Sequence, residues 1–265
     1  MQNIKIKLIK IERLAERIYR SVFKTDKLPP FIPGQFANIA VGAAGALLRR
    51  PISVCTVDSE SNAFAIVFET RGKGTEYLAA MKEGDVTEAT AFLGNGFEVK
   101  PKYKRIALLG GGVGAAPLLS VTGYNGGAPL LDMTDKADKN SAVEFYAFLG
   151  FGSADKAFMI EEFKDACKRV EIATDDGSLG AKGYALDLLV KNLSQVKPDA
   201  IFACGPKPMI KALAAADIGV PVFASVEERM ACGYGVCMVC ACKTTDGYKR
   251  VCADGPVFDI KDLSF

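Results

Sequence analysis

Histidine is absent from the sequence, and this absence removes several kinds of catalytic site at once. Without an imidazole the chain has no histidine general base, no Ser-His-Asp triad, no Rieske centre and no histidine-ligated zinc ion. Any chemistry must therefore use backbone amides, carboxylates, thiolates or a bound cofactor.

Long apolar runs and a large excess of charge are also missing. The N-terminal stretch MQNIKIKLIKIERLAERIY holds no long uncharged apolar run, so we expect no signal peptide. The sequence contains no run of ~18 apolar residues, so we expect no membrane-spanning helix. The location expected by default is the cytoplasm. The formal net charge is only +2, which gives no indication of nucleic-acid binding.

Cysteine, by contrast, is abundant, and five of the eight cysteines fall between residues 232 and 252. Cys232, Cys237, Cys240 and Cys252 follow the C-x4-C-x2-C…C spacing of a plant-ferredoxin-type [2Fe–2S] cluster. A structural zinc site usually has two separate C-x2-C knuckles, and only one is present, so zinc is the less favoured alternative. We interpret Cys242 as a buried neighbour of the cluster and not as a ligand.

The hydrophobic pattern divides the chain into three segments. Residues 1–101 contain short alternating strands separated by turn signals, which predicts a small antiparallel β-barrel with one helix near 75–81. In residues 102–226 apolar strands alternate with helices, which predicts a parallel sheet with crossover connections. Residues 227–265 are too few to bury a core of their own, and a metal cluster would hold them together.

The second segment predicts five strands and three later helices around one irregular connection. We expect an extended or broken crossover over 120–143, where glycines interrupt the position of a helix. The expected strands are 106–109, 144–149, 170–173, 200–203 and 222–225, and the expected helices are 156–167, 184–193 and 208–216.

Two motifs in the barrel segment indicate a phosphate-bearing ligand. Arg50-Pro51-Ile52-Ser53 ends a candidate strand, and a glycine-rich turn with Gly74 and Thr75 opens the expected helix. The first N–H groups of a helix suit a pyrophosphate, and Arg50 and Ser53 could add a cation and a hydroxyl. An Arg-Pro pair alone usually marks no more than a turn, so the prediction of a phosphate site depends on finding both motifs in the same segment.

Two further motifs end strands of the predicted parallel sheet. Gly110-Gly111-Gly112-Val113-Gly114-Ala115 fits G-x-G-x-x-A after a strand. No acidic residue ends the next strand, since Asp155 is displaced from it, so we predict a nucleotide site of a design related to the Rossmann fold. Cys204-Gly205-Pro206 follows a later strand, where it is either part of this site or a tight turn with a buried cysteine.

Together these motifs resemble the ferredoxin–NADP reductase superfamily. The C-terminal segments from Arg229 to Cys240 and from Val251 to Phe258 are similar, within it, to electron-transfer subunits of class 1B dihydroorotate dehydrogenases. The resemblance implies a fold of α/β plus all-β class: an N-terminal antiparallel flavin-binding β-barrel, a parallel α/β nucleotide-binding domain and a small C-terminal [2Fe–2S] subdomain. The implied domains are 1–101 for FAD, 102–226 for NAD and 227–265 for the cluster.

The resemblance also implies roles for individual residues. In such proteins the R-P-x-S segment binds FAD, the G-T pair binds its pyrophosphate and the strand between them lines the flavin. Gly152 stands where relatives often carry a basic residue for a 2′-phosphate, which favours NAD over NADP. The implied FAD residues are Arg50, Pro51, Ile52, Ser53, Val67, Phe68, Glu69, Gly74 and Thr75; the implied NAD residues are Gly110, Gly111, Gly112, Gly114, Cys204, Gly205 and Pro206; and the implied cluster ligands are Cys232, Cys237, Cys240 and Cys252.

The function implied by the resemblance is electron transfer in pyrimidine (UMP) biosynthesis. The chain would pass electrons from the FMN of a catalytic dihydroorotate dehydrogenase subunit through the cluster and FAD to NAD⁺, in a heterotetramer with two copies of each subunit. One alternative is the flavin and iron–sulfur subunit of an NADH-dependent ferredoxin:NADP oxidoreductase or of a sulfide dehydrogenase. An alternative of another class is a zinc-stapled nucleotide-binding module that docks partners.

Overall fold

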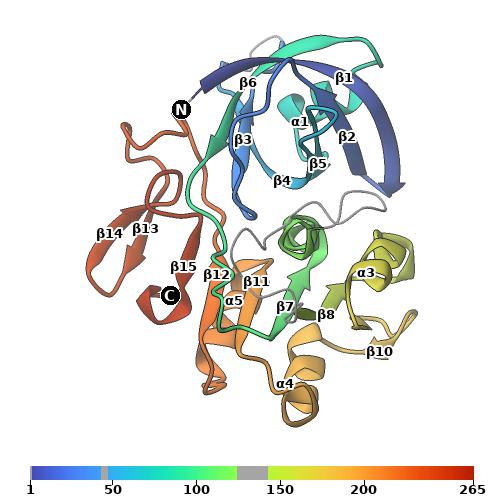
Figure 1. The fold of residues 1–265 in the computed structure, drawn as a ribbon, viewed down its shortest axis with the longest axis vertical. Coiled ribbons are helices and arrows are strands. Elements are labelled where there is room, and N and C mark those ends of the chain that lie inside the picture. The colour runs from blue at the N-terminus through green and yellow to red at the C-terminus, as the bar shows by residue number, and fades with distance from the viewer. Residues whose placement is uncertain (1, 43–46, 124–142) are drawn as a thin grey trace.

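The N-terminal part of the chain forms a closed antiparallel β-barrel. The computed structural model describes residues 2–42, 47–123 and 143–265 (Figure 1). The barrel strands follow one another in the order β1-β2-β5-β4-β3-β6. Helix α1 (Lys73–Ala80) connects the fifth strand to the sixth. The strands are β1 (Gln2–Ala15), β2 (Ile18–Lys24), β3 (Phe36–Ile39), β4 (Arg50–Asp58), β5 (Ala63–Glu69) and β6 (Val86–Leu93).

The second part is a seven-stranded sheet in the order β10-β9-β8-β7-β11-β12-β15. All neighbouring strands in it are parallel except the β12–β15 pair. The chain starts at β7 and moves first to one side and then to the other, so the strand order reverses between β7 and β11. The strands are β7 (Arg105–Gly111), β8 (Glu144–Phe151), β9 (Arg169–Thr174), β10 (Ala181–Lys182), β11 (Ala200–Cys204), β12 (Val222–Ser225) and β15 (Val257–Asp259).

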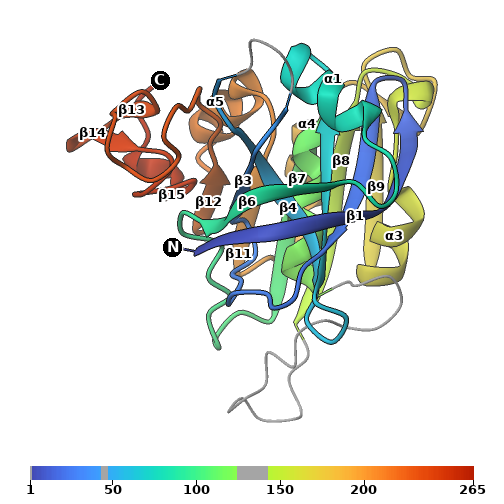
Figure 2. The same ribbon diagram turned by 90° about the horizontal axis from the view of Figure 1, so that it is seen from above.

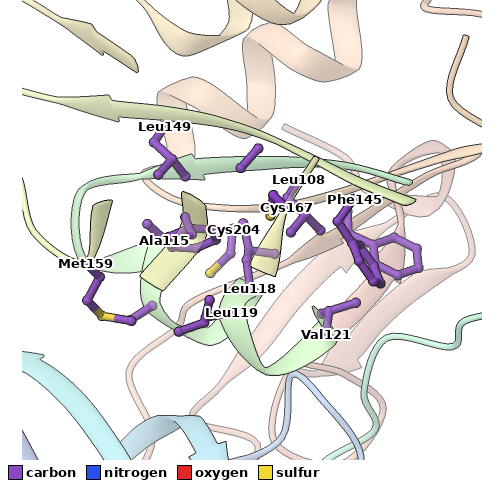
Figure 3. Close-up of a cluster of buried hydrophobic side chains, with 14 of the residues drawn as sticks. Leu108, Ala115, Leu118, Leu119, Val121, Phe145, Leu149, Met159, Cys167 and Cys204 are labelled. Atoms are coloured by element: carbon purple, nitrogen blue, oxygen red, sulfur yellow. The ribbon is translucent and has the colours of Figure 1, made fainter. Parts of the chain in front are cut away.

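Helices cover both faces of this sheet. Helices α2 (Ala115–Leu119) and α3 (Ile160–Ala166) lie on the face toward the barrel, where their apolar side chains form one buried cluster with β7 and β8 (Figure 3). Helices α4 (Ala185–Val196) and α5 (Lys207–Ala215) bury Leu189, Ile210 and Leu213 on the opposite face. The barrel has its own core around Phe23 and Phe64. Short 3₁₀ turns span Gly112–Gly114, Ser120–Thr122, Ala154–Lys156 and Ile260–Asp262.

The C-terminal segment lies at one end of the molecule, opposite α3 (Figures 1 and 2). It contains a hairpin of β13 (Ala241–Thr244) and β14 (Gly247–Arg250), and it then adds β15 to the edge of the large sheet. A small buried cluster joins it to the barrel through Phe36 and Leu93. The segment is therefore packed against both larger parts of the protein.

Most of the elements expected from the sequence are confirmed, with one clear difference. The antiparallel barrel, its single helix and the alternation of parallel strands with helices are all present. The helix expected over 156–167 is instead a 3₁₀ turn followed by α3, because Met159 between them takes a left-handed backbone conformation with φ of 58°. Most of the broken crossover expected over 120–143 lies outside the described residues. None of the described helices is long and apolar enough to cross a membrane.

Candidate functional site

A cavity of about 230 Å³ lies between the barrel and the loop after β7. The barrel contributes the ends of β4 and β5 and the start of α1, and Val113 and Pro117 contribute from the other side. The structure thus brings most of the predicted flavin residues to one place. Those that line the cavity are Pro51, Ile52, Ser53, Val67, Phe68, Glu69 and Thr75.

Arg50 and Gly74, the other two predicted flavin residues, meet at the N-terminus of α1. Gly74 is buried, and a Cβ on it would lie only 2.7 Å from Nη2 of Arg50. The Thr75 hydroxyl accepts hydrogen bonds from the N–H groups of Arg71 at 2.9 Å and Gly72 at 3.3 Å, which closes the turn before the helix. A guanidinium placed against a helix N-terminus fits a pyrophosphate group.

A second cavity, of about 660 Å³, opens at the carboxyl edge of the parallel sheet. The loops after β7 and β11 form its floor, at the point where the strand order reverses, which is where nucleotides bind in such sheets. An adjoining cavity of about 560 Å³ continues past Gly152 toward Asp175 and Tyr184. The predicted nucleotide residues that line the larger cavity are Gly111, Gly112, Gly114, Gly205 and Pro206.

These two loops pack backbone against backbone. A Cβ on Gly114 would lie 2.7 Å from the carbonyl oxygen of Cys204, and a Cβ on Gly111 would lie 2.8 Å from Cδ of Pro206. Side chains would therefore push the loops apart, and glycine is needed at both positions.

Two predicted nucleotide residues, Gly110 and Cys204, do not line the cavity. Gly110 is buried in β7, where a Cβ would lie 2.9 Å from Ala115. Cys204 lies in the apolar cluster that also holds Leu108 and Leu118 (Figure 3). Burial raises the pKa of the Cys204 thiol well above its usual range.

A group of three charged side chains separates the two main cavities, and two of them, Arg71 and Glu227, were not identified from the sequence. Glu69, Arg71 and Glu227 line both of them. Arg71 forms an ion pair with Glu69 at 2.7 Å. Glu227 is exposed within the cavities, and desolvation by the cavity walls raises the pKa of its carboxyl group, with Arg71 opposing and Glu69 adding to the rise. The position of Glu227 just after β12 could have indicated it, because ligands bind at this edge of the sheet.

The four predicted cluster ligands come together beside the hairpin of β13 and β14. Backbone N–H groups point at their sulfur atoms: Gly235 N–H at Cys252 Sγ (3.0 Å), Cys252 N–H at Cys240 Sγ (3.4 Å) and Cys232 N–H at Cys237 Sγ (3.5 Å). Gly233 and Gly235 have φ of 79° and 88°, which lets the loop curl around the thiols. Amide donors around a set of convergent thiols fit the thiolates of an iron–sulfur cluster.

The local environment acts differently on the individual thiols. Burial raises the pKa of Cys232, but hydrogen bonds from the backbone of Tyr234 and from Cys237 outweigh it and bring the pKa to about 6. Burial and the neighbouring Cys240 raise the pKa of Cys252 to about 12. In the described residues, no group of three or more His, Cys, Asp or Glu side chains is arranged to hold a metal ion. A two-iron cluster instead spreads its four thiolate ligands over two metal atoms.

The predicted non-ligand Cys242 is buried in β13. It pairs across the hairpin with Lys249, and burial raises the pKa of its thiol.

The cysteine loop adjoins the flavin cavity directly. Met230 and Pro256, which flank the cysteines in the sequence, line that cavity. Asn38 of β3 donates a hydrogen bond to the carbonyl oxygen of Cys232 at 3.3 Å, so a barrel strand holds the start of the loop. The three candidate sites therefore form a continuous series, with the flavin cavity in the middle.

Comparison with known proteins supports this arrangement. Residues 227–264 match the family model of the iron–sulfur cluster binding domain of dihydroorotate dehydrogenase B. The dihydroorotate dehydrogenase B (NAD(+)) electron transfer subunit of Caldanaerobacter subterraneus subsp. tengcongensis is 37% identical over 99% of both chains. The subunit of the same name from Bacillus caldolyticus is 39% identical over 85% of this chain and 84% of its own length.

Solved structures show the same architecture. An NADH-dependent reduced ferredoxin-NADP oxidoreductase structure, with a TM-score of 0.82, is 29% identical and covers 98% of this chain and 89% of its own. Phthalate dioxygenase reductase has a TM-score of 0.65 at 17% identity, covers 92% and 87% of the two chains, and shows the fold alone. Since full-length relatives exceed 30% identity, the chain belongs to the family of dihydroorotate dehydrogenase B (NAD(+)) electron transfer subunits.

Proposed function

We propose that this chain is the electron transfer subunit of a cytoplasmic dihydroorotate dehydrogenase that serves pyrimidine (UMP) biosynthesis. It conveys electrons from the FMN of a catalytic subunit, through a [2Fe–2S] cluster and FAD, to NAD⁺. Bound in their sites, these cofactors supply the electron and hydride chemistry, while the protein supplies position and electrostatics. The observation that carries the proposal is the flavin cavity, which shares walls with the nucleotide cavity on one side and with the cysteine loop on the other.

The chain's own residues hold each group in place. Arg50 and the start of α1 would bind the FAD pyrophosphate, and Ser53 and Glu69, which line the flavin cavity, would hold the flavin ring. The loops after β7 and β11 bind NAD⁺ at the carboxyl edge of the sheet. Cys232, Cys237, Cys240 and Cys252 bind the cluster, and residues 1–101, 102–226 and 227–265 are the three domains.

An exposed apolar surface around the cysteine loop is evidence for an interface with a partner subunit. Tyr234, Val236, Met238 and Val239 are between 48% and 75% exposed, and they surround Cys237, itself exposed. Apolar patches of this kind mark protein–protein interfaces. The catalytic subunit docks on this surface, in an assembly with two copies of each subunit.

A second candidate is supported by the structural comparison. The NADH-dependent reduced ferredoxin-NADP oxidoreductase covers nearly the whole chain at 29% identity. In that case the same three sites would connect NADH to a different iron–sulfur flavoprotein partner. The identity of the partner separates the two candidates.

The decisive experiment purifies the chain together with its co-expressed partner and measures NAD⁺ reduction by dihydroorotate. We expect turnover that requires both subunits, together with iron and FAD in the purified chain. Turnover with reduced ferredoxin and NADP⁺, but not with dihydroorotate, would support the second candidate. A colourless protein that contains zinc and no iron would contradict both.

A further inference from the structure

An ion pair brackets the fourth proposed cluster ligand. Arg250 and Asp254 lie two residues before and two residues after Cys252. The guanidinium donates to the carboxylate from Nε at 2.9 Å and from Nη2 at 3.0 Å, and the backbone N–H of Arg250 adds a third hydrogen bond at 2.8 Å. Such a bidentate pair fixes orientation as well as distance.

The same guanidinium reaches across to the loop that carries the first three ligands. Nη1 of Arg250 donates a hydrogen bond to the carbonyl oxygen of Gly235 at 2.9 Å. The N–H of Gly235 in turn donates to Sγ of Cys252 at 3.0 Å. Arg250 thus ties the loop segment between Cys232 and Cys237 to the separate segment that contributes Cys252.

The space around this connection leaves little freedom. Gly235 has φ of 88°, and a Cβ on it would lie 2.9 Å from Cβ of Ala253 and 3.5 Å from Nη1 of Arg250. The loop therefore packs against Ala253 as closely as a glycine allows, which holds it beside the Arg250 side chain.

We propose that Arg250 and Asp254 are positioning residues that align Cys252 with the cysteine loop and set the reduction potential of the cluster by their opposite charges. This inference rests on the proposed cluster site. The potential of an iron–sulfur cluster depends on nearby charge, on hydrogen bonds to its sulfur atoms and on solvent exposure. The form with one more electron carries one more negative charge, so a nearby cation stabilises it and a nearby anion destabilises it.

The charges of the pair therefore predict opposite effects for the two partners. Loss of the Arg250 charge makes the cluster harder to reduce, and loss of the Asp254 charge makes it easier to reduce. A purely structural role would instead move both variants in the same direction, because each would loosen the same loop.

The test measures iron content and the midpoint potential of the cluster, by electron paramagnetic resonance during redox titration of the FAD-loaded chain. Arg250→Gln should lower the midpoint potential and Asp254→Asn should raise it. Each should change the equilibrium constant for one-electron reduction by about threefold to tenfold, and a tenfold change corresponds to about 59 mV. Arg250→Lys, which keeps the charge but loses the two-pronged contact, should fall between Arg250→Gln and the unsubstituted protein. Lys191→Gln, an exposed position on α4 away from the cysteine loop, removes the same charge as Arg250→Gln and is the matched control; it should leave the potential unchanged.

Each result decides one part of the inference. Shifts of the same sign in Arg250→Gln and Asp254→Asn, or no shift in either, overturn the electrostatic role. If Arg250→Gln loses its iron, the positioning role is supported, and Arg250→Lys and Asp254→Asn still decide the role of charge. Iron and cluster signals in the unsubstituted chain test the proposed cluster site separately, since their absence would contradict that site before any variant is compared.

Discussion

The guanidinium of Arg50 rests on the backbone of Gly74, with Nη2 only 2.7 Å from the place that a Cβ would occupy. A methyl group at Gly74 must displace the arginine, because the side chain is the part that can move. We predict that Gly74→Ala weakens FAD binding by about tenfold or more, since one or two charge-assisted hydrogen bonds to the pyrophosphate would be lost. Titration of the FAD-free chain with FAD, followed by flavin fluorescence, measures the effect.

Gly72 provides the matched control for this substitution. It precedes the same helix, but a Cβ on it would meet nothing within 4 Å, and its φ of 168° is an extended conformation open to any residue. Gly72→Ala should therefore bind FAD as the unsubstituted chain does. Equal affinity in the two alanine variants would show that Arg50 does not contact the pyrophosphate.

The cysteine loop offers a second test, by comparison of two buried cysteines. Cys252 accepts a backbone hydrogen bond on its sulfur and lies among the other proposed ligands, whereas Cys242 lies in β13. Cys252→Ser should abolish or strongly reduce iron content, and Cys242→Ser should leave it nearly unchanged. Iron analysis and visible absorption of both purified variants give the answer, and the reverse pattern would show that the fourth ligand is Cys242.

The agreement between sequence and structure is closest where the signal is local. The C-x4-C-x2-C spacing fixes three of the cysteines on one short loop, and period-two alternation in residues 1–101 predicts a barrel that the structure contains. The glycine run that includes Gly114 is visible in the sequence, although the contact with the loop after β11 that requires Gly114 is seen only in the structure. These features depend on residues that are close together in the chain.

Features that depend on distant segments could not be predicted. Arg71, Glu69 and Glu227 meet between two cavities only because β5 and β12 end at the same place in the folded protein. For Cys204 the sequence left two possibilities, a nucleotide contact or a buried cysteine, and its side chain packs into the core, since alternate residues of a buried strand point to opposite faces of the sheet. The left-handed conformation of Met159 has no signal in the sequence either.

Glu227 leads to a prediction about pH. Desolvation by the cavity walls raises the pKa of its carboxyl group in the folded protein above its usual value of 4.5. Between the unfolded and the folded pKa the native state binds more protons than the unfolded state, so stability falls as the pH rises through this window. Glu227→Gln removes this effect, and the variant should gain thermal stability relative to the unsubstituted chain as the pH increases from about 4.5 to 7.

Thermal unfolding of both FAD-loaded proteins over that pH range measures the difference. Glu228→Gln is the control, because it removes the neighbouring carboxylate, which lines the flavin cavity but not the nucleotide cavity. A stability difference between Glu227→Gln and the unsubstituted chain that stays constant with pH would contradict the assignment.

Arg20 joins the barrel to the parallel sheet, and its removal should loosen that contact. Its Nη1 lies 2.9 Å from Glu162 of α3, and its Nε pairs with Glu12 of β1, with all three side chains less than 30% exposed. Arg20→Ala leaves two partly buried carboxylates without their cation, and we expect a loss of about 1–3 kcal/mol in the free energy of unfolding, between the values for exposed and buried ion pairs. Lys164→Ala breaks an exposed pair within α3, with Glu161, and should cost less than about 0.5 kcal/mol. Denaturant unfolding compares the two variants, and equal losses would show that the Arg20 contact does not couple the barrel to α3.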